Sequence, residues 1–211
     1  MKSLAEISGY KYSHAQLGCA HDYLLPRVTD IIRRHFSSPD EKRRLFDLGC
    51  GNGAVANYFS GQGYDVVNVD PSVEGVAEAQ KAYPHIRIEQ GSAYDDLSTR
   101  YGSFPVVISL EVVEHVYAPR QFAASVFNLL ERNGIAVIST PYHGYVKNIA
   151  VAIANGFDKH VNPLWDHGHI KFWSMRTLSE LLREAGFARI SFHRVGRVPM
   201  LAKSMIAVAK K

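Results

Sequence analysis

Three glycines at alternate positions directly follow an apolar run early in the chain. The run Leu45–Leu48 leads into Gly49, Gly51 and Gly53, and an amphipathic pattern follows. This order predicts a buried strand, a tight turn and a helix whose first turn faces a ligand, because glycine permits positive φ and close approach of another molecule. A helix N-terminus adds free N–H groups and a positive dipole end. The stretch therefore predicts a nucleotide-type binding loop.

Apolar strands alternate with amphipathic helices along the rest of the chain. Apolar runs at 66–69, 106–110 and 135–138 are separated by helical patterns, and two more strands are expected around 188–195 and 201–208. This alternation predicts a parallel sheet covered by helices on both faces. In such sheets, ligands bind beyond the carboxyl ends of the strands, where the strand order reverses. The candidate site residues at these ends are Asp47–Gly53, Asp70, Ser92, Ala93, Glu111–His115 and Thr140 onward.

Some helical details are specific enough to test. Pro26 suits the first position of a helix. The helix that follows the second strand is expected to turn Val73, Val76 and Ala77 inward, and a later helix is expected to run through Leu130.

Composition narrows the class of protein. A length of 211 residues favours one domain over 1–211 with a substantial core. The net charge is +4, but basic and acidic residues are mixed and no basic stripe is interleaved with aromatics, so nucleic acid is not an expected partner. Cys19 and Cys50 form no disulfide framework. With no signal peptide and no apolar window of about 18 residues, a cytoplasmic protein is expected.

The glycine spacing bears on which nucleotide binds. The dinucleotide fingerprint is G-x-G-x-x-G, whereas Gly49, Gly51 and Gly53 place the third glycine one residue early. Asp70 ends the second strand, where a carboxylate can accept hydrogen bonds from both hydroxyls of a ribose, and both cofactor classes need that. The spacing argues against a nicotinamide-dependent oxidoreductase. Two alternatives nevertheless stay open, such an oxidoreductase and a non-catalytic cofactor-binding protein.

Several blocks of the sequence closely resemble the class I S-adenosylmethionine-dependent methyltransferases. The matching blocks, in the family order, are Asp47–Gly53, Asn68–Ser72, Glu111–Val116, Asn133–Pro141 and Glu184–Phe187. The resemblance implies a Rossmann-like, doubly wound α/β fold. Its mostly parallel seven-stranded sheet would have helices on both faces and an antiparallel C-terminal strand. The cofactor it implies is S-adenosyl-L-methionine, with S-adenosyl-L-homocysteine as product.

The nearest resemblance within that family is to the ubiquinone-biosynthesis O-methyltransferases. It is carried by Glu111–Val116, by the apolar insertion Tyr145–Phe157 and by Lys171-Phe172. It implies methyl transfer to a small-molecule acceptor, expected to be an oxygen nucleophile such as a phenol, a catechol or a lipid or natural-product hydroxyl. N-methylation of a small molecule is the alternative.

The resemblance also implies cofactor contacts, position by position. Asp47, Gly49, Gly51, Asn52 and Gly53 are expected around the methionine half. Asp70 is expected at the ribose hydroxyls and Pro71 near the adenine. The remaining expected contacts are Ser92 and Ala93 at the adenine, Glu111 and Val112 at the methionine and sulfonium, and Arg27 at the cofactor carboxylate. The block around Ser92 departs from the family pattern, because its acidic residue, Asp95, comes two positions late.

Methyl transfer to a phenol requires that its proton be removed, and a group with a pKa near neutrality suits that task. His115 directly follows the Glu111 block and is the first candidate base. The alternative interpretation is a structural histidine bonded to backbone. His143 and His169 are weaker candidates, should the later segment close over the acceptor.

Two segments outside the alternating pattern are expected to select the acceptor. One is an N-terminal cap over about 1–25, and the other is a lid-like insertion over about 141–173. The Asp166–His169 run, with His143 and His160, lacks ligand spacing on a helix, so the sequence predicts a polar lid and no metal. The apolar run at about 145–157 is expected to pack on the domain or form a lid, with transient membrane contact as the alternative.

Overall fold

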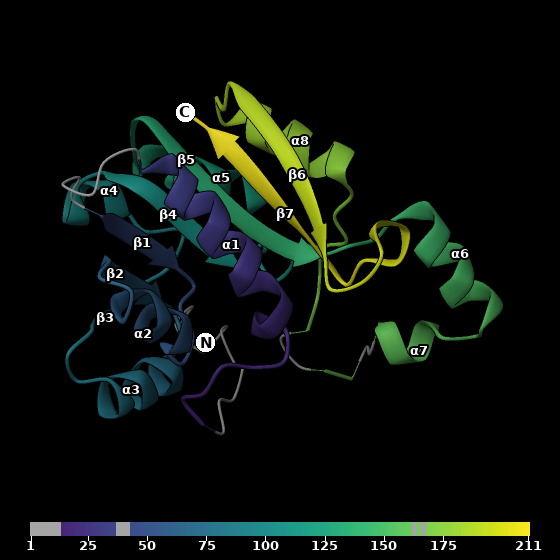
Figure 1. Cartoon of the computed structure of the whole chain (residues 1–211), viewed down its shortest axis with the longest axis horizontal. Helices are drawn as coiled ribbons and strands as arrows, with labels where there is room; N and C mark the ends of the chain where they lie inside the picture. Colours follow the sequence, from purple (N-terminus) through teal and green to yellow (C-terminus); the bar gives the residue numbers. More distant parts are fainter. Residues whose placement is uncertain (1–13, 37–42, 162–163, 166–167) are drawn as a thin grey trace, which may run out of the picture.

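A mixed sheet forms the centre of the molecule. The computed structural model describes residues 14–36, 43–161, 164–165 and 168–211. Seven strands pair in the order β3-β2-β1-β4-β5-β7-β6 (Figure 1). Strands β1 to β5 run parallel, and β7 runs antiparallel to both of its neighbours. The strands are β1 Arg44–Leu48, β2 Asp65–Asp70, β3 Arg87–Gln90, β4 Phe104–Leu110, β5 Leu130–Pro141, β6 Arg189–Val195 and β7 Ser204–Lys210. The predicted fold is therefore confirmed.

Helices cover both faces of the sheet. Against one face lie α1 His21–His35, α2 Ala54–Ser60 and α3 Val73–Ala82, and against the other lie α4 Leu97–Tyr101, α5 Pro119–Asn128 and α8 Met175–Glu184. Successive strand residues alternate between the two cores, as Leu45 and Phe46 do, because side chains in a strand point to opposite faces. The central strands are buried on both faces, which explains why they read as continuous apolar runs.

The point where the strand order reverses lies between β1 and β4. Strand β1 pairs with β2 on one side and with β4 on the other, all in the same direction. The carboxyl ends of these three strands therefore open at one edge of the sheet. This edge carries the glycine loop after β1, Asp70 at the end of β2 and Glu111 after β4.

Three helical details differ from the sequence-based predictions. Helix α1 begins at His21 and contains Pro26 in its interior, so residues 21–25 of the predicted cap are helical. In α3 the buried residues are Gly75, Val76 and Ala79, whereas Val73 and Ala77 are exposed. The predictions that Val73 and Ala77 point inward were wrong, because the glycine loop packs against Ala79, where a Cβ on Gly53 would lie 2.9 Å from the Ala79 Cβ, and the helix buries the face that carries Ala79.

The third difference concerns the end of α5. Leu130 is the first residue of β5, not part of the preceding helix, and it pairs with Phe104 of β4. The loop expected at 37–40 and residues 1–13 of the cap lie outside the described residues. None of the described helices is long and apolar enough to cross a membrane.

Candidate functional site

The loop after β1 adopts the backbone conformation that its glycines allow. Gly49, Gly51 and Gly53 have φ values of 88°, 53° and 74°, in the region that side chains other than glycine rarely adopt. A Cβ on Gly49 would lie 2.5 Å from Cγ2 of Val112, and a Cβ on Gly53 would lie 2.7 Å from Cδ1 of Ile88. The loop is therefore packed closely against Val112 after β4 and Ile88 of β3, and side chains at Gly49 and Gly53 would not fit there.

Asp70 fastens this loop to the end of β2. Its Oδ2 accepts a hydrogen bond of 2.8 Å from the Gly51 N–H, and its Oδ1 accepts one of 2.8 Å from the Ser72 N–H. Burial raises the pKa of the Asp70 carboxyl, and these two backbone donors oppose that rise. Each oxygen keeps a second lone pair, so the side chain can still accept hydrogen bonds from two ribose hydroxyls.

Replacing Asp70 tests this assignment. We expect Asp70→Ala to weaken S-adenosylmethionine binding by about 1.5–3 kcal/mol, the cost of losing hydrogen bonds to a charged group. Calorimetric titration measures the change. Asp65→Ala is a matched control, because Asp65 lies at the exposed opposite end of the same strand and should leave the affinity unaltered. Unchanged affinity in Asp70→Ala would show that the ribose is held elsewhere.

Asp47, next to the end of β1, is buried without a full set of partners. Its side chain is 2% exposed and its Oδ2 accepts no hydrogen bond from the described residues. Burial, followed by the charge of Asp70, raises the pKa of Asp47 to about 8. An unpaired buried carboxyl oxygen beside the glycine loop fits the cationic amino group of S-adenosylmethionine, because that group would supply both the missing donor and the opposite charge.

The raised pKa of Asp47 makes the stability of the ligand-free protein depend on pH. The pKa of this carboxyl rises from its ordinary value of 3.8 to about 8 on folding. Between these values the unfolded chain releases the proton that the folded chain keeps, so stability should fall as the pH rises from about 4 to about 8. Urea denaturation over this range checks the effect. In Asp47→Asn, the part of this pH dependence that comes from Asp47 should disappear. If the unfolding free energy of the variant falls with pH as steeply as that of the wild type, the raised pKa of Asp47 is wrong.

Asn52 connects the loop to the segment ahead of α1. Its Nδ2 donates to the carbonyl oxygens of His14 and Gln16, at 2.8 and 3.1 Å, and its Oδ1 accepts from the Ala54 N–H at 3.2 Å. The Tyr83 hydroxyl donates to the carbonyl oxygen of Ala15. The described part of the predicted cap is thus tied over the glycine loop. A direct contact between Asn52 and the cofactor stays a prediction.

The loop after β3 closes the adenine side of the predicted site. The Ser92 N–H donates to Oδ2 of Asp95 at 2.7 Å, and the Tyr94 N–H donates to Oγ of Ser92 at 3.2 Å. Gln90 donates to the Pro71 carbonyl oxygen at 3.5 Å, so this loop lies beside the end of β2. Asp95, which comes two positions later than the acidic residue of the family pattern, therefore stabilises the turn of this loop through its hydrogen bond with the Ser92 N–H. Ala93 lies in the same turn, partly buried against the core.

Glu111 is held firmly at the end of β4. Its φ is 56°, which is uncommon for a residue with a side chain. Oε1 accepts from the Ser139 hydroxyl at 2.8 Å and Oε2 accepts from the Ser204 hydroxyl at 3.3 Å, which in turn lies 3.3 Å from the Tyr23 hydroxyl. Burial raises the pKa of Glu111 to about 7. The sequence did not identify Ser139, Ser204 or Tyr23, because they come from three distant segments.

A histidine cluster follows Glu111. The His115 and His169 ring centroids lie 4.8 Å apart, and the Trp165 ring lies 5.9 Å from His115. The Nδ1 atom of His115 lies 3.2 Å from the carbonyl oxygen of Gly168, which can only accept, so Nδ1 is the donor of this hydrogen bond. Burial, and then the charges of His115 and His143, lower the pKa of His169 to about 4. His169 is therefore neutral at pH 7.

Two further predicted site residues, His143 and Arg27, make contacts of their own outside the glycine loop and the histidine cluster. His143 packs its ring against Phe172, with centroids 5.2 Å apart, and burial lowers its pKa. Arg27 lies on α1 with an exposed side chain, and its guanidinium forms an ion pair of 3.2 Å with Asp30. The predicted contact between Arg27 and the cofactor carboxylate stays a prediction. Asp166 and His167 lie outside the described residues.

The insertion contains two helices, α6 Tyr145–Ile153 and α7 Phe157–His160, which project from the domain (Figure 1). None of the residues of α6 is buried, and Tyr145 and Ile153 are 81% and 82% exposed. The apolar face of α6 is therefore largely exposed in the described part of the chain. One interpretation of the sequence expected this face to pack on the domain, and the structure does not show that packing. A lid and a membrane contact stay predictions for this segment.

Glu114 lies within the predicted Glu111–His115 stretch, but the sequence predicted no role for its carboxyl group. It is 1% exposed, and neither carboxyl oxygen has a hydrogen-bond partner among the described residues. Burial, and then the charge of Glu111, raise its pKa well above the usual range. The available signal was an ionisable pair, Glu114-His115, set between the apolar residues Val113 and Val116.

Similar proteins share both the sequence pattern and the fold. A family model described as a methyltransferase domain matches residues 20–191. The ubiquinone biosynthesis O-methyltransferase of Azorhizobium caulinodans is 32% identical over 171 residues, which cover 76% of this chain and 67% of that protein. The protein of the same name from Cereibacter sphaeroides is 30% identical over 183 residues, covering 84% of this chain and 74% of its own.

Solved structures agree on the fold. A SAM-dependent methyltransferase from Archaeoglobus fulgidus superposes with a TM-score of 0.63 and 16% identity, over 88% of this chain and 94% of that one. The Haemonchus contortus phosphoethanolamine N-methyltransferase 2, in complex with S-adenosyl-L-methionine, gives a TM-score of 0.64 and 14% identity, over 88% of this chain and 52% of that one. The family match includes the glycine loop, Asp70 and Glu111.

Proposed function

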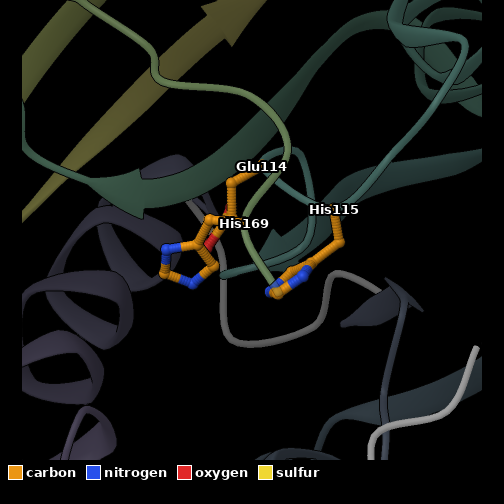
Figure 2. Close-up of side chains that lie close together, drawn as sticks. All are labelled: Glu114, His115 and His169. Atoms are coloured by element: carbon orange, nitrogen blue, oxygen red, sulfur yellow. The ribbon is translucent and has the colours of Figure 1, made fainter. Parts of the chain in front are cut away.

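We propose that this chain, which belongs to the family of S-adenosylmethionine-dependent methyltransferases, transfers a methyl group to an oxygen atom of a small aromatic acceptor. One observation carries the proposal. The imidazole rings of His115 and His169 lie with their centroids 4.8 Å apart (Figure 2), and His115 follows closely on Glu111 and Val112, the residues after β4 that border the predicted cofactor site. The names of the relatives at 30% and 32% identity support the choice of oxygen over nitrogen.

The chain supplies a fixed frame for the cofactor. The backbone of the glycine loop and the Asp47 carboxylate hold the methionine end, and Asp70 holds the ribose. S-adenosylmethionine supplies an electrophilic methyl group on a sulfonium sulfur, so little covalent chemistry is required of the protein. The glycine loop, Val112 and Glu111 fix where that methyl group points. Such alignment, together with exclusion of water, accounts for much of the rate in reactions of this kind.

The acceptor needs help in losing its proton. The acceptor oxygen forms a bond to the methyl carbon while the carbon–sulfur bond breaks, and the electron pair of that bond stays on sulfur. The hydroxyl proton must pass to a protein group or to water before or during this step. His169, whose imidazole is neutral at pH 7, lies beside His115 and would offer a lone-pair nitrogen to a phenolic or catecholic hydroxyl. A neutral amine is already a good nucleophile before it loses a proton, so an amine acceptor would depend less on these imidazoles than a phenol would.

An activity screen tests the proposal. Protein is incubated with methyl-labelled S-adenosylmethionine and separate panels of phenols and catechols, lipid quinols, amines and sugars. We expect label in the phenol and catechol or the quinol panel. Transfer to amines alone would overturn the choice of oxygen. Calorimetry with S-adenosylmethionine and with NAD, run on the same preparation, shows whether an inactive sample still binds its cofactor.

A further inference from the structure

The two tryptophans of the chain have very different surroundings. Trp173 is 8% exposed and its indole N–H donates to the Val113 carbonyl oxygen at 3.0 Å, so this ring belongs to the core. Trp165 lies between α7 and α8 as well, but it is 40% exposed. Tryptophan is highly buried on average, because its ring offers a large apolar area to the core. An indole left this open near the predicted acceptor position therefore indicates a binding surface.

The Trp165 ring packs against both imidazoles of the histidine cluster. Its centroid lies 5.9 Å from that of His115, with the ring planes 81° apart, and 5.3 Å from that of His169, with the planes 55° apart. Figure 2 shows these two imidazoles, one from the segment after β4 and the other from the segment ahead of α8. The contacts place the indole at the imidazoles that are proposed to meet the acceptor, and a large part of the indole stays uncovered.

Gly168 allows the indole to lie against the backbone. A Cβ on this residue would lie 3.2 Å from Cε3 and 3.3 Å from Cδ2 of Trp165. The Gly168 N–H donates to the Trp165 carbonyl oxygen at 2.9 Å, and the Gly168 carbonyl oxygen accepts from Nδ1 of His115 at 3.2 Å. Just beyond, the backbone N–H groups of 170–171 both donate to the Glu114 carbonyl oxygen at 3.0 Å. The indole is therefore held in place before a ligand binds, which lowers the entropy cost of binding.

From this arrangement we infer that Trp165 is the surface on which the aromatic ring of the acceptor packs, and that it sets a preference for aromatic over aliphatic hydroxyls. The inference rests on the proposed function, because it names the residue that selects the acceptor class. An indole and a phenol or catechol ring attract one another in offset-stacked or edge-to-face arrangements. A ring packed on Trp165 would carry its hydroxyl next to the neighbouring imidazoles.

A cationic ammonium group is the other kind of ligand that a tryptophan face attracts. Sites for quaternary ammonium groups are built as cages of aromatic faces. The rings that pack against Trp165 are imidazoles, which gain a positive charge when protonated and would then repel an ammonium group. The surroundings of Trp165 therefore favour a neutral aromatic ring, and binding of an ammonium group is one outcome of the test.

Tryptophan fluorescence of the full chain tests the contact. Protein saturated with S-adenosylhomocysteine is titrated with catechol, with cyclohexane-1,2-diol, which has a ring of similar size without π electrons, and with tetramethylammonium. We expect catechol to quench the emission and the two other probes to leave it unchanged. In Trp165→Phe the remaining emission comes from the buried Trp173 and should no longer respond to catechol.

Steady-state methyl transfer to the best aromatic acceptor from the screen tests the specificity. Trp165→Leu should raise KM for this acceptor by about 2–12-fold, the usual worth of an aromatic pair, with little change in kcat. Trp165→Phe keeps an aromatic ring and should keep KM within about twofold of the wild type. Tyr117→Leu removes a different aromatic side chain, which is 82% exposed, and should leave KM unchanged.

The outcomes separate this inference from the proposed function. If catechol fails to quench the wild type, or if KM is unaltered in Trp165→Leu, the role of Trp165 is overturned and O-methyl transfer stands without it. Quenching by tetramethylammonium alone also overturns the role. Quenching by catechol that disappears in Trp165→Phe supports the contact even where the screen finds only N-methylation. Thermal unfolding and cofactor titration of Trp165→Leu show that a raised KM does not arise from a damaged fold.

Discussion

Gly49→Ala is expected to lower the free energy of unfolding by about 2–6 kcal/mol and to weaken cofactor binding. Two costs combine. A φ of 88° is strained for alanine, at about 1–3 kcal/mol, and the new Cβ would lie 2.5 Å from Cγ2 of Val112, with an overpacking cost of about 1–3 kcal/mol. To relieve the contact, either the loop or Val112 must move, and both border the predicted cofactor site. Urea denaturation and calorimetric titration measure the two effects.

Gly63 provides a matched control for this variant. Its φ is 82°, but a Cβ there would have nothing within 4 Å. Gly63→Ala should therefore show the backbone strain without the crowding, at about 1–3 kcal/mol, and its cofactor affinity should equal that of the wild type. Adding Val112→Ala to Gly49→Ala should recover the part of the loss due to crowding. If Gly49→Ala and Gly63→Ala prove equally mild, the close packing of the loop against Val112 is wrong.

His115→Ala is expected to lower the rate of methyl transfer by about 10²–10⁴-fold, the usual contribution of a group that handles a proton at the reacting centre. Cofactor affinity should stay within about twofold, because His115 lies beyond the residues that hold the cofactor. Single-turnover transfer to the best acceptor from the screen measures the rate. Calorimetry and thermal unfolding serve as controls for an intact fold. Full activity in this variant would reject any role for the cluster in the chemistry.

A comparison with Glu114→Gln separates two explanations of such a loss. A base at His115 acts without Glu114, so Glu114→Gln should then retain most of the rate. A role that also needs the Glu114 carboxyl predicts instead that the two variants are impaired alike. The retention of both imidazoles in Glu114→Gln makes this comparison independent of their packing against Trp165.

Features encoded by neighbouring residues could be predicted from the sequence. The apolar run before Gly49 and the position of Asp70 at a strand end depend on local patterns, and the sheet brings them together at the order reversal. The parallel architecture followed from strands that are apolar throughout. Helix boundaries were harder: the proline rule placed the start of α1 at Pro26, whereas packing of Leu24 and Leu25 in the core extends the helix back to His21.

The acceptor side depends on contacts between distant segments. His169 meets Glu114 and His115 across more than fifty intervening residues through the pairing of 170–171 with the Glu114 carbonyl oxygen. No local period signals such a contact. The exposed apolar face of α6 could not be inferred either, because an amphipathic pattern gives the same sequence whether its apolar side packs, closes over a ligand or meets another surface.

The transfer of a ¹³C-labelled methyl group tests the central claim most directly. The protein is incubated with S-adenosylmethionine labelled at the sulfonium methyl and with an acceptor that has both a phenolic hydroxyl and an amine. Two-dimensional NMR then shows whether the labelled methyl carbon is attached to the phenolic oxygen or to the amine nitrogen. The proposed function predicts the label on the phenolic oxygen. A label on the nitrogen, with the hydroxyl unmodified, would contradict it.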